Sequence, residues 1–332
     1  MSDVLDVRGL TVALATQAGT IRPVDGVSFK VGAGRTLAIV GESGSGKSLT
    51  CLSLLGVLPQ SARVVAGHAY FEGRDLLALP EEELQTLRGS SIGTVLQDPH
   101  AALDPLFTVG EQIREVIAFQ HRASRANSRA SSIEAMRAVH IPAPGQRYGA
   151  YPHQFSGGMR QRAAIAMAVA CQPALLIADE PTTALDATIG QQMLRLLAEL
   201  RASHGMSMLF VTHDLPLVRF FCDDVAVMYA GRIVEQGPVE RVFEHPAHPY
   251  TTALIKATPR LTRRRARLQT IEGQPPSFHA LPAGCHFAPR CPLAEARCTT
   301  SYPEMNALES TSHQAACWRA EEQVLQPRES CV

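Results

Sequence analysis

The sequence predicts an α/β fold built on a P-loop nucleotide-binding core, and three observations predict it. Residues 40–48 read Val-Gly-Glu-Ser-Gly-Ser-Gly-Lys-Ser and match the pattern G-x-x-x-x-G-K-[ST] at every fixed position. The apolar run 37–40 precedes this loop as a strand, and residues 49–58 follow it with helical spacing. A second apolar run, 175–178, ends in two acidic residues. A phosphate-binding loop requires this strand, loop and helix context.

The chemistry of polyphosphate binding explains the residue types in this loop. Glycines let the backbone turn tightly and bring its N–H groups up to the phosphate oxygens. The helix that follows directs its positive N-terminal end at the same anions. Lys47 would reach the β- and γ-phosphates, and the Ser48 hydroxyl would be a Mg²⁺ ligand. The predicted nucleotide contacts of the loop are Gly41, Ser43, Gly44, Ser45, Gly46, Lys47, Ser48 and Leu49.

The bulk composition excludes several classes of protein. The chain has 332 residues, which is enough for about two domains at ~150 residues each. Lys+Arg and Asp+Glu both number 31, so the charge gives no support for a general nucleic-acid binder. No run approaches 18 apolar residues, and the N-terminus does not resemble a signal peptide. We expect a cytosolic protein whose eight cysteines are thiols or metal ligands.

The segment before the loop reads as an antiparallel sheet. Residues 4–14 and 24–31 alternate as strands do, and residues 16–20 between them have turn composition. Many nucleotide-binding domains of this layout place an aromatic ring here against the adenine. The nearest positions, Ala13 and Leu14, are not aromatic. If adenine lies here, it packs on an aliphatic surface, and nucleobase selectivity would be loose.

The segment after the loop carries a strand and a helical insertion. Residues 80–87 begin a helix with three glutamates in its first turn, where acids suit the helix dipole. Residues 92–96 form a strand that ends at Gln97, whose amide oxygen can hold Mg²⁺ or the attacking water; the alternative is a turn residue. From 109 to about 150 the pattern is helical and irregular, which predicts an insertion between two halves of the core.

Residues 155–161, Phe-Ser-Gly-Gly-Met-Arg-Gln, open a helix that continues to about residue 171. A Ser-Gly-Gly turn at a helix N-terminus is a second anion-binding device. The chain already has one phosphate loop. The second device therefore serves another nucleotide, or the same nucleotide from the opposite side.

The strand 175–178 ends in Asp179 and Glu180. Such a strand delivers Asp179 to the Mg²⁺ and Glu180 toward the γ-phosphate, where it can polarise a water for in-line attack. The alternative is a strand that happens to end in acids. Further on, Asp186 precedes a helix over 189–203, and the strand 208–211 ends near His213. His213 can contact the γ-phosphate or have a structural role. Residues 225–237 are predicted to form a β-hairpin.

Six motifs now stand in order: GESGSGKS, LQDP, FSGGMRQR, LLIADEP, ALD and VTHD. Over residues 4–240 the chain resembles the ATPase subunits of ATP-binding cassette (ABC) transporters. The resemblance implies the ABC ATPase fold and a dimer that holds each ATP between the phosphate loop of one subunit and the Ser-Gly-Gly turn of the other. The aromatic residue expected to pack on adenine is missing at positions 13 and 14, and the signature reads FSGGM, not LSGGQ, a variant typical of the peptide-uptake branch.

The resemblance also implies a role for each matching residue. Gln97 would sense Mg²⁺ and the helical domain, and Asp186 would contact the other subunit. Ser156, Gly157 and Gly158 would close on the γ-phosphate bound by that subunit. Asp179 would be the Mg²⁺ ligand with Ser48 and Gln97, Glu180 the general base and His213 the γ-phosphate sensor.

The segments 248–254, 271–276 and 284–292 resemble the C-terminal extension of dipeptide and oligopeptide import ATPases, a branch whose relatives also serve nickel and glutathione import. The resemblance implies an ATPase domain over 1–240, with a helical subdomain over about 98–160, and an extension over 241–332. It implies a second ATPase subunit such as a paralogue, two membrane permeases and an extracytoplasmic substrate-binding protein. The chain would lie peripherally on the cytoplasmic face of the inner membrane.

Two functions of other kinds stay open against this interpretation. Soluble ABC ATPases act in translation or DNA repair, but they usually carry two cassettes in one chain or a long coiled-coil insertion. A binding module that has lost catalysis is the other alternative. The presence of Glu180 and His213 argues against it.

Four cysteines of the extension form a cluster: Cys285, Cys291, Cys298 and Cys317. Thiols gathered in a Pro/Gly-rich segment indicate a tetrathiolate site, although no gap is the two-residue spacing of a zinc ribbon. Resemblance to dipeptide-type ATPases implies a [4Fe–4S] cluster; zinc is the second alternative and free thiols the third. The arginine run 260–267 reads as a solvated linker, with contact to lipid headgroups as the alternative.

Overall fold

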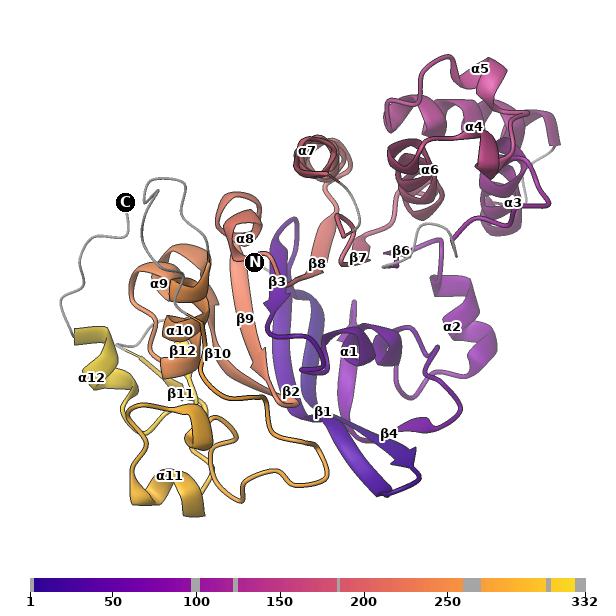
Figure 1. The fold of residues 1–332 in the computed structure, drawn as a ribbon. Helices are drawn as coiled ribbons and strands as arrows, with labels where there is room; N and C mark the ends of the chain where they lie inside the picture. The colour runs from indigo at the N-terminus through magenta and orange to yellow at the C-terminus, as the bar shows by residue number, and fades with distance from the viewer. Residues whose placement is uncertain are drawn as a thin grey trace. The chain divides into compact units, whose positions relative to one another are not determined.

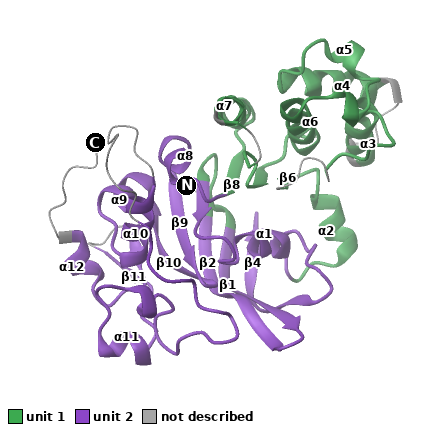
Figure 2. Ribbon diagram, viewed as in Figure 1, with its two compact units in different colours: residues 1–5, 31–36, 78–211 green, residues 6–30, 37–77, 212–332 purple. Residues whose placement is uncertain are grey.

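The computed structural model describes residues 3–96, 102–121, 125–183, 186–258, 270–308 and 312–325. The chain divides into two compact units, shown in different colours in Figure 2. Unit 1 comprises residues 1–5, 31–36 and 78–211, and unit 2 comprises residues 6–30, 37–77 and 212–332. No helix in the described ranges is long and apolar enough to cross a membrane.

Unit 1 contains three parallel strands. The central strand β7 (Leu175–Asp179) pairs with β6 (Ile92–Val95) on one side and with β8 (Ser207–Thr212) on the other. All of β7 and β8 is buried, as expected for parallel strands that are covered on both faces. The helices α2 (Glu81–Leu87) and α7 (Ala187–His204) flank these strands along the chain.

The other helices of unit 1 gather into a cluster (Figure 1). It contains α3 (Val109–His121), α4 (Arg125–Ala138), α5 (Pro144–Arg147), the 3-10 helix η1 (Pro152–Gln154) and α6 (Gly157–Val169). Ile113 and Met136 are fully buried among them. The helical character predicted for 109–150 is confirmed, whereas the subdomain bounds at 98 and 160 stay a prediction.

Unit 2 holds the phosphate loop and two sheets. The first has the strand order β2 (Gly19–Gly32), β1 (Asp3–Thr16), β4 (Ala62–Phe71), β5 (Arg74–Asp75). In the second, β3 (Thr36–Val40) runs parallel to β9 (Asp224–Tyr229), which pairs antiparallel with β10 (Arg232–Pro238). The predicted hairpin at 225–237 is therefore confirmed.

The helix after the loop, α1 (Lys47–Leu54), is shorter than the prediction of 49–58. Two residues beyond its end, Gly56 takes a φ of 64°, a left-handed conformation that terminates helices. Pro59 then follows. The predicted helix was too long because the apolar residues at 57 and 58 continue the helical spacing. Hydrophobic spacing alone does not show that Gly56 ends the helix.

The chain beyond the hairpin stays within unit 2. The helix α8 (Leu215–Phe221) precedes the hairpin. After the hairpin the chain forms α9 (Val239–Glu244), α10 (Pro249–Ala257), the 3-10 helix η2 (Ala288–Arg290), α11 (Ala296–Thr300), β11 (Asn306–Ala307), β12 (Gln314–Ala315) and α12 (Ala320–Leu325). Strand β12 pairs antiparallel with β10, and β11 pairs with β12. The extension thus adds strands to the sheet that contains β3, while the boundary predicted at residue 240 stays a prediction.

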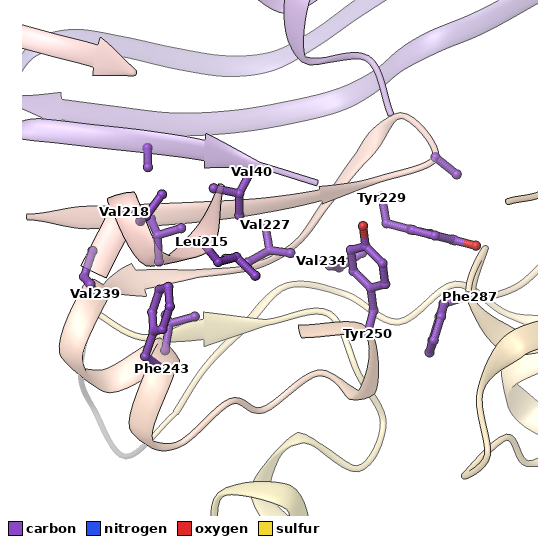
Figure 3. Packing of buried hydrophobic residues seen from close by; sticks show 14 of the residues in the cluster. Val40, Leu215, Val218, Val227, Tyr229, Val234, Val239, Phe243, Tyr250 and Phe287 are labelled. Atoms are coloured by element: carbon purple, nitrogen blue, oxygen red, sulfur yellow. The ribbon is translucent and has the colours of Figure 1, made fainter. Parts of the chain in front are cut away.

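One hydrophobic core joins these parts of unit 2. Val40 from β3, Leu215 from α8 and Phe243 from α9 belong to the same buried cluster. Figure 3 shows the rings of Tyr229, Tyr250 and Phe287 gathered at one end of it. The centroids of Tyr229 and Tyr250 are 4.5 Å apart, and Phe287 meets Tyr229 edge-on at 5.3 Å. Aromatic packing of this kind fixes the extension against the end of β9.

A buried carboxylate also holds the extension. Glu235 on β10 is fully buried and accepts three hydrogen bonds: from the backbone N–H groups of Ala247 (2.7 Å) and His248 (2.8 Å), and from His313 Nε2 (2.8 Å). A buried carboxylate is tolerated only when its oxygens are satisfied in this way. Glu235 therefore connects β10 to the entry of α10 and to the residue before β12.

We expect Glu235→Ala to lower the free energy of unfolding by about 3 kcal/mol, because it removes the acceptor of two buried backbone N–H groups and of a histidine. Urea unfolding of the full-length chain measures this change. The control is Glu240→Ala, which removes an exposed glutamate from α9 and should change stability by less than about 0.5 kcal/mol. Equal effects of the two substitutions would contradict a structural role for Glu235.

Candidate functional site

The phosphate loop is shaped by its neighbours in unit 2. Gly46 has a φ of 107°, and a Cβ placed on it would lie 2.1 Å from the carbonyl oxygen of Pro23 on β2. A Cβ on Gly41 would lie 2.1 Å from the carbonyl oxygen of Met228 on β9. Neither approach leaves room for a side chain. These two glycines are therefore required by the packing of the loop as well as by access to phosphate.

Lys47 folds back over the loop that it follows. Its Nζ donates to the carbonyl oxygens of Gly41 and Glu42, both at 2.9 Å, and lies 3.5 Å from Ser45 Oγ. The residue is only 5% exposed. The positive charge is therefore held beside the backbone of the loop. Ser48 lies half-buried in the first turn of α1, where its hydroxyl is next to the positive end of the helix.

The outer part of the loop lines a pocket of about 210 Å³, and every residue that lines it belongs to unit 2. The loop contributes residues 42–45, the end of β9 contributes Tyr229, and the turn after it contributes Ala230. The other lining residues are Pro275, Pro276 and Phe278. A wall of the pocket over the phosphate loop thus comes from the C-terminal extension.

The predicted metal ligand and general base lie next to each other in unit 1. Asp179 ends β7 and is 4% exposed. Glu180 follows with a φ of 47°, which is uncommon for a residue with a side chain, and its N–H donates to Val211 O at 2.9 Å. Its Oε2 accepts from Thr183 Oγ1 at 2.8 Å. Backbone strain of this kind occurs at functional sites, where the surrounding structure fixes one side-chain direction.

The Ser-Gly-Gly turn begins α6, as predicted. Ser156 caps the helix, and its Oγ accepts from the N–H of Met159 at 3.3 Å. Gly157 is exposed with open space where a Cβ would lie, so the N-terminus of α6 is accessible to an anion. Buried Gln161 donates Nε2 to the carbonyl of Pro181 at 2.8 Å. Sequence reasoning missed this link between α6 and the loop after Glu180, although Gln161 lies within the motif.

Three predicted site residues remain: Asp186, His213 and Gln97. Asp186 is exposed and caps α7, with Oδ1 accepting from the N–H of Ile189 at 3.0 Å. His213 is exposed in unit 2, directly after β8 and before the α8 cap residue Asp214. Gln97 lies outside the described residues, as does the arginine run 260–267.

The four clustered cysteines line one pocket of unit 2, together with residues that include Phe287 and Trp318. Burial raises the pKa of Cys285 to about 11 and of Cys317 to about 12, so both are neutral thiols at pH 7. Within the described part of the chain, no group of three or more His, Cys, Asp or Glu side chains could hold a metal ion. The structure brings the thiols together but does not support the predicted iron–sulfur or zinc site.

A phosphate loop after one strand and paired acids after another define the class of P-loop nucleotide hydrolases. Residues 24–183 match the ABC transporter family, and residues 234–298 match the C-terminal region of oligopeptide/dipeptide transporters. The chain therefore belongs to the ABC transporter family, among the ATP-binding proteins that carry this C-terminal region. The predicted ABC ATPase fold and the predicted branch are both confirmed.

Three similar proteins illustrate this relationship. The dipeptide transport ATP-binding protein DppD of Bacillus subtilis is 46% identical, over 98% of each chain. The oligopeptide transport ATP-binding protein OppD of Salmonella typhimurium is 46% identical, over 97% of this chain and 95% of its own. Among solved structures, the dimeric ATP-binding cassette MJ0796 bound to ADP and Pi aligns with a TM-score of 0.64 and 27% identity, over 71% of this chain and 98% of that chain.

We expect Gly46→Ala to weaken ATP binding by at least about tenfold, because the added methyl group would meet the Pro23 carbonyl and displace the loop. Titration of the full-length chain with a fluorescent ATP analogue measures the dissociation constant. Gly26→Ala is the control: Gly26 also has a positive φ, 69°, but has open space around a Cβ. It should cost about 1 kcal/mol of stability and leave ATP affinity within about twofold. Equal affinities of the two variants would contradict the packing argument.

Proposed function

We propose that this chain is the ATP-hydrolysing subunit of an importer of dipeptides or oligopeptides. The observation that carries the proposal is that a cassette and an oligopeptide/dipeptide C-terminal region occur together in one chain. Relatives named for peptide transport match nearly its whole length. They give no support to nickel or glutathione import, or to an ABC ATPase of translation or DNA repair.

In this proposal the site residues keep the roles that the resemblance implies. Lys47 and the loop backbone bind the phosphates of ATP, Ser48 and Asp179 hold Mg²⁺ with Gln97, and Glu180 acts as the general base. His213 senses the γ-phosphate. Buried Lys47 with its loop contacts supports the first role. The strained backbone of Glu180 and the hydrogen bond that it accepts from Thr183 support a carboxylate held in one direction.

We propose that the active assembly is a dimer of ATPase subunits on two membrane permeases, supplied by an extracytoplasmic substrate-binding protein. The accessible N-terminus of α6, with Ser156, Gly157 and Gly158, would contact the ATP bound by the second subunit. Asp186 is exposed beside α7 and would contact that subunit. The chain would lie on the cytoplasmic face of the membrane without spanning it.

We expect Glu180→Gln to lower the ATP hydrolysis rate by about 10²–10⁴-fold while ATP still binds, because the amide cannot accept a proton from the attacking water. In cells, the same variant should abolish uptake of labelled di- or tripeptides. Hydrolysis is measured by phosphate release from the assembly purified in mild detergent, and its subunits are identified by mass spectrometry.

The control is Glu199→Gln, which changes an exposed glutamate of α7 and should leave hydrolysis unchanged. Recovery of two permeases with the wild-type chain supports the transporter. Recovery of ribosomes or DNA instead would overturn it, and normal peptide uptake by Glu180→Gln would overturn the assignment of the base.

We further propose that the four clustered cysteines bind a [4Fe–4S] cluster. The proposal rests on the convergence of the four thiols on one pocket and on the cysteine ligands that such clusters use. Burial raises the pKa of Cys285 and of Cys317, so binding must displace the protons of these two thiols and should be favoured by higher pH.

Anaerobic purification of the full-length chain should yield about four iron and four sulfide per protein, and the visible absorption should be lost in Cys285→Ser. Cys171→Ser is the control, since Cys171 does not line the pocket. Zinc, or protein without metal, would overturn the proposal.

A further inference from the structure

Two residues of the C-terminal extension hydrogen-bond to Glu42 of the phosphate loop. Arg290 Nη1 donates to Glu42 Oε2 at 2.7 Å, and Nη2 donates to Glu42 Oε1 at 3.1 Å. The backbone N–H of Glu42 donates to the hydroxyl of Tyr250 at 2.9 Å. Arg290 ends η2, and Tyr250 lies in the first turn of α10, so two separate segments of the extension meet at a single loop residue. All three residues belong to unit 2.

Arg290 is placed for this contact by the rest of its surroundings. Its side chain is 4% exposed. Its Nη1 also donates to the Tyr229 hydroxyl at 3.2 Å, and its Nε donates to Glu272 O at 2.9 Å. Burial alone would lower the pKa of the guanidinium, but the hydrogen bonds to Glu42 and Tyr229 raise it above its usual value. The buried arginine is therefore a fixed cation in bidentate contact with a carboxylate.

Tyr250 is equally constrained. It is fully buried, and its ring packs against Tyr229 at 4.5 Å and Phe287 at 5.4 Å between centroids (Figure 3). Its hydroxyl reaches the loop, where it accepts from the N–H of Glu42. Since the ring cannot move without disturbing this aromatic cluster, the hydroxyl oxygen is a fixed acceptor for the Glu42 N–H.

The contacts of Arg290 and Tyr250 with Glu42 affect both the net charge of the phosphate loop and its conformation. Glu42 carries a negative charge in a loop that binds polyphosphate, and Arg290 neutralises it. The carbonyl of Glu42 also accepts from Lys47 Nζ at 2.9 Å. Holding Glu42 therefore helps to hold the lysine that binds phosphate. A preorganised loop loses less conformational freedom when ATP binds, which strengthens binding.

We propose that Arg290 and Tyr250 are positioning residues of the ATP site, by which the C-terminal extension fixes the phosphate loop and cancels the charge of Glu42. The inference rests on the proposed function, because it requires that this loop binds ATP. It makes the extension a part of the nucleotide site in addition to any other role.

The test uses the full-length chain in the assembly with which it purifies. Arg290→Gln should weaken ATP binding about tenfold, which corresponds to about 1.4 kcal/mol. Tyr250→Phe keeps the ring and should weaken binding about threefold. In both variants kcat at saturating ATP should change less than the dissociation constant, since neither residue touches the reacting atoms. Arg297→Gln is the matched control, because this exposed arginine pairs with Glu295 in the same extension, and it should leave affinity unchanged.

A rescue variant separates charge cancellation from general stability. Adding Glu42→Gln to Arg290→Gln removes the uncompensated carboxylate and should restore ATP affinity to within about threefold of wild type. A folded Arg290→Gln variant with wild-type affinity, or a double variant no better than the single one, would overturn the inference. If Arg290→Gln does not fold, unchanged affinity of Tyr250→Phe overturns it. Wild-type protein that fails to bind ATP overturns the proposed function and the inference together.

Discussion

The close approach of the phosphate loop to its neighbours is the constraint on which the rest of unit 2 depends. The loop backbone lies against the carbonyls of Pro23 and Met228, and Lys47 folds back onto the carbonyls of the loop. A loop packed in this way presents its donors in one arrangement before any ligand arrives. The strands β2 and β9, which supply the two carbonyls, must therefore be fixed relative to β3.

The extension supplies part of that fixation. Its aromatic residues complete the core that contains Val40 and Tyr229, and Glu235 holds the entry of α10. Through Arg290 and Tyr250 the extension also contacts the loop itself. The C-terminal extension thus packs against and hydrogen-bonds to the part of the cassette that carries the phosphate loop. A substitution in the extension is therefore expected to change the stability of the loop.

Most strands and helices, and the family to which the motifs belong, could be predicted from the sequence, because each depends on a local pattern or a short motif. The sequence predicted the end of α1 too late, since a single glycine outweighed the apolar pattern. It could not predict that Arg290 pairs with Glu42, 248 residues away, or that Gln161 reaches the Pro181 carbonyl. Such partners are set by tertiary packing. The cysteine spacing correctly indicated a shared location, but spacing does not determine whether the thiols bind a metal.

The pairing of β10 with β12 has a consequence for how this protein is made. His313 and Glu235 lie 78 residues apart, and the carboxylate is buried with His313 as one of its three donors. Translation proceeds from the N-terminus, so the hairpin leaves the ribosome well before its last partner does. During that interval the sheet edge at β10 is open to other strands. A chain truncated before His313 should therefore leave this edge of β10 uncovered and Glu235 without one of its three donors.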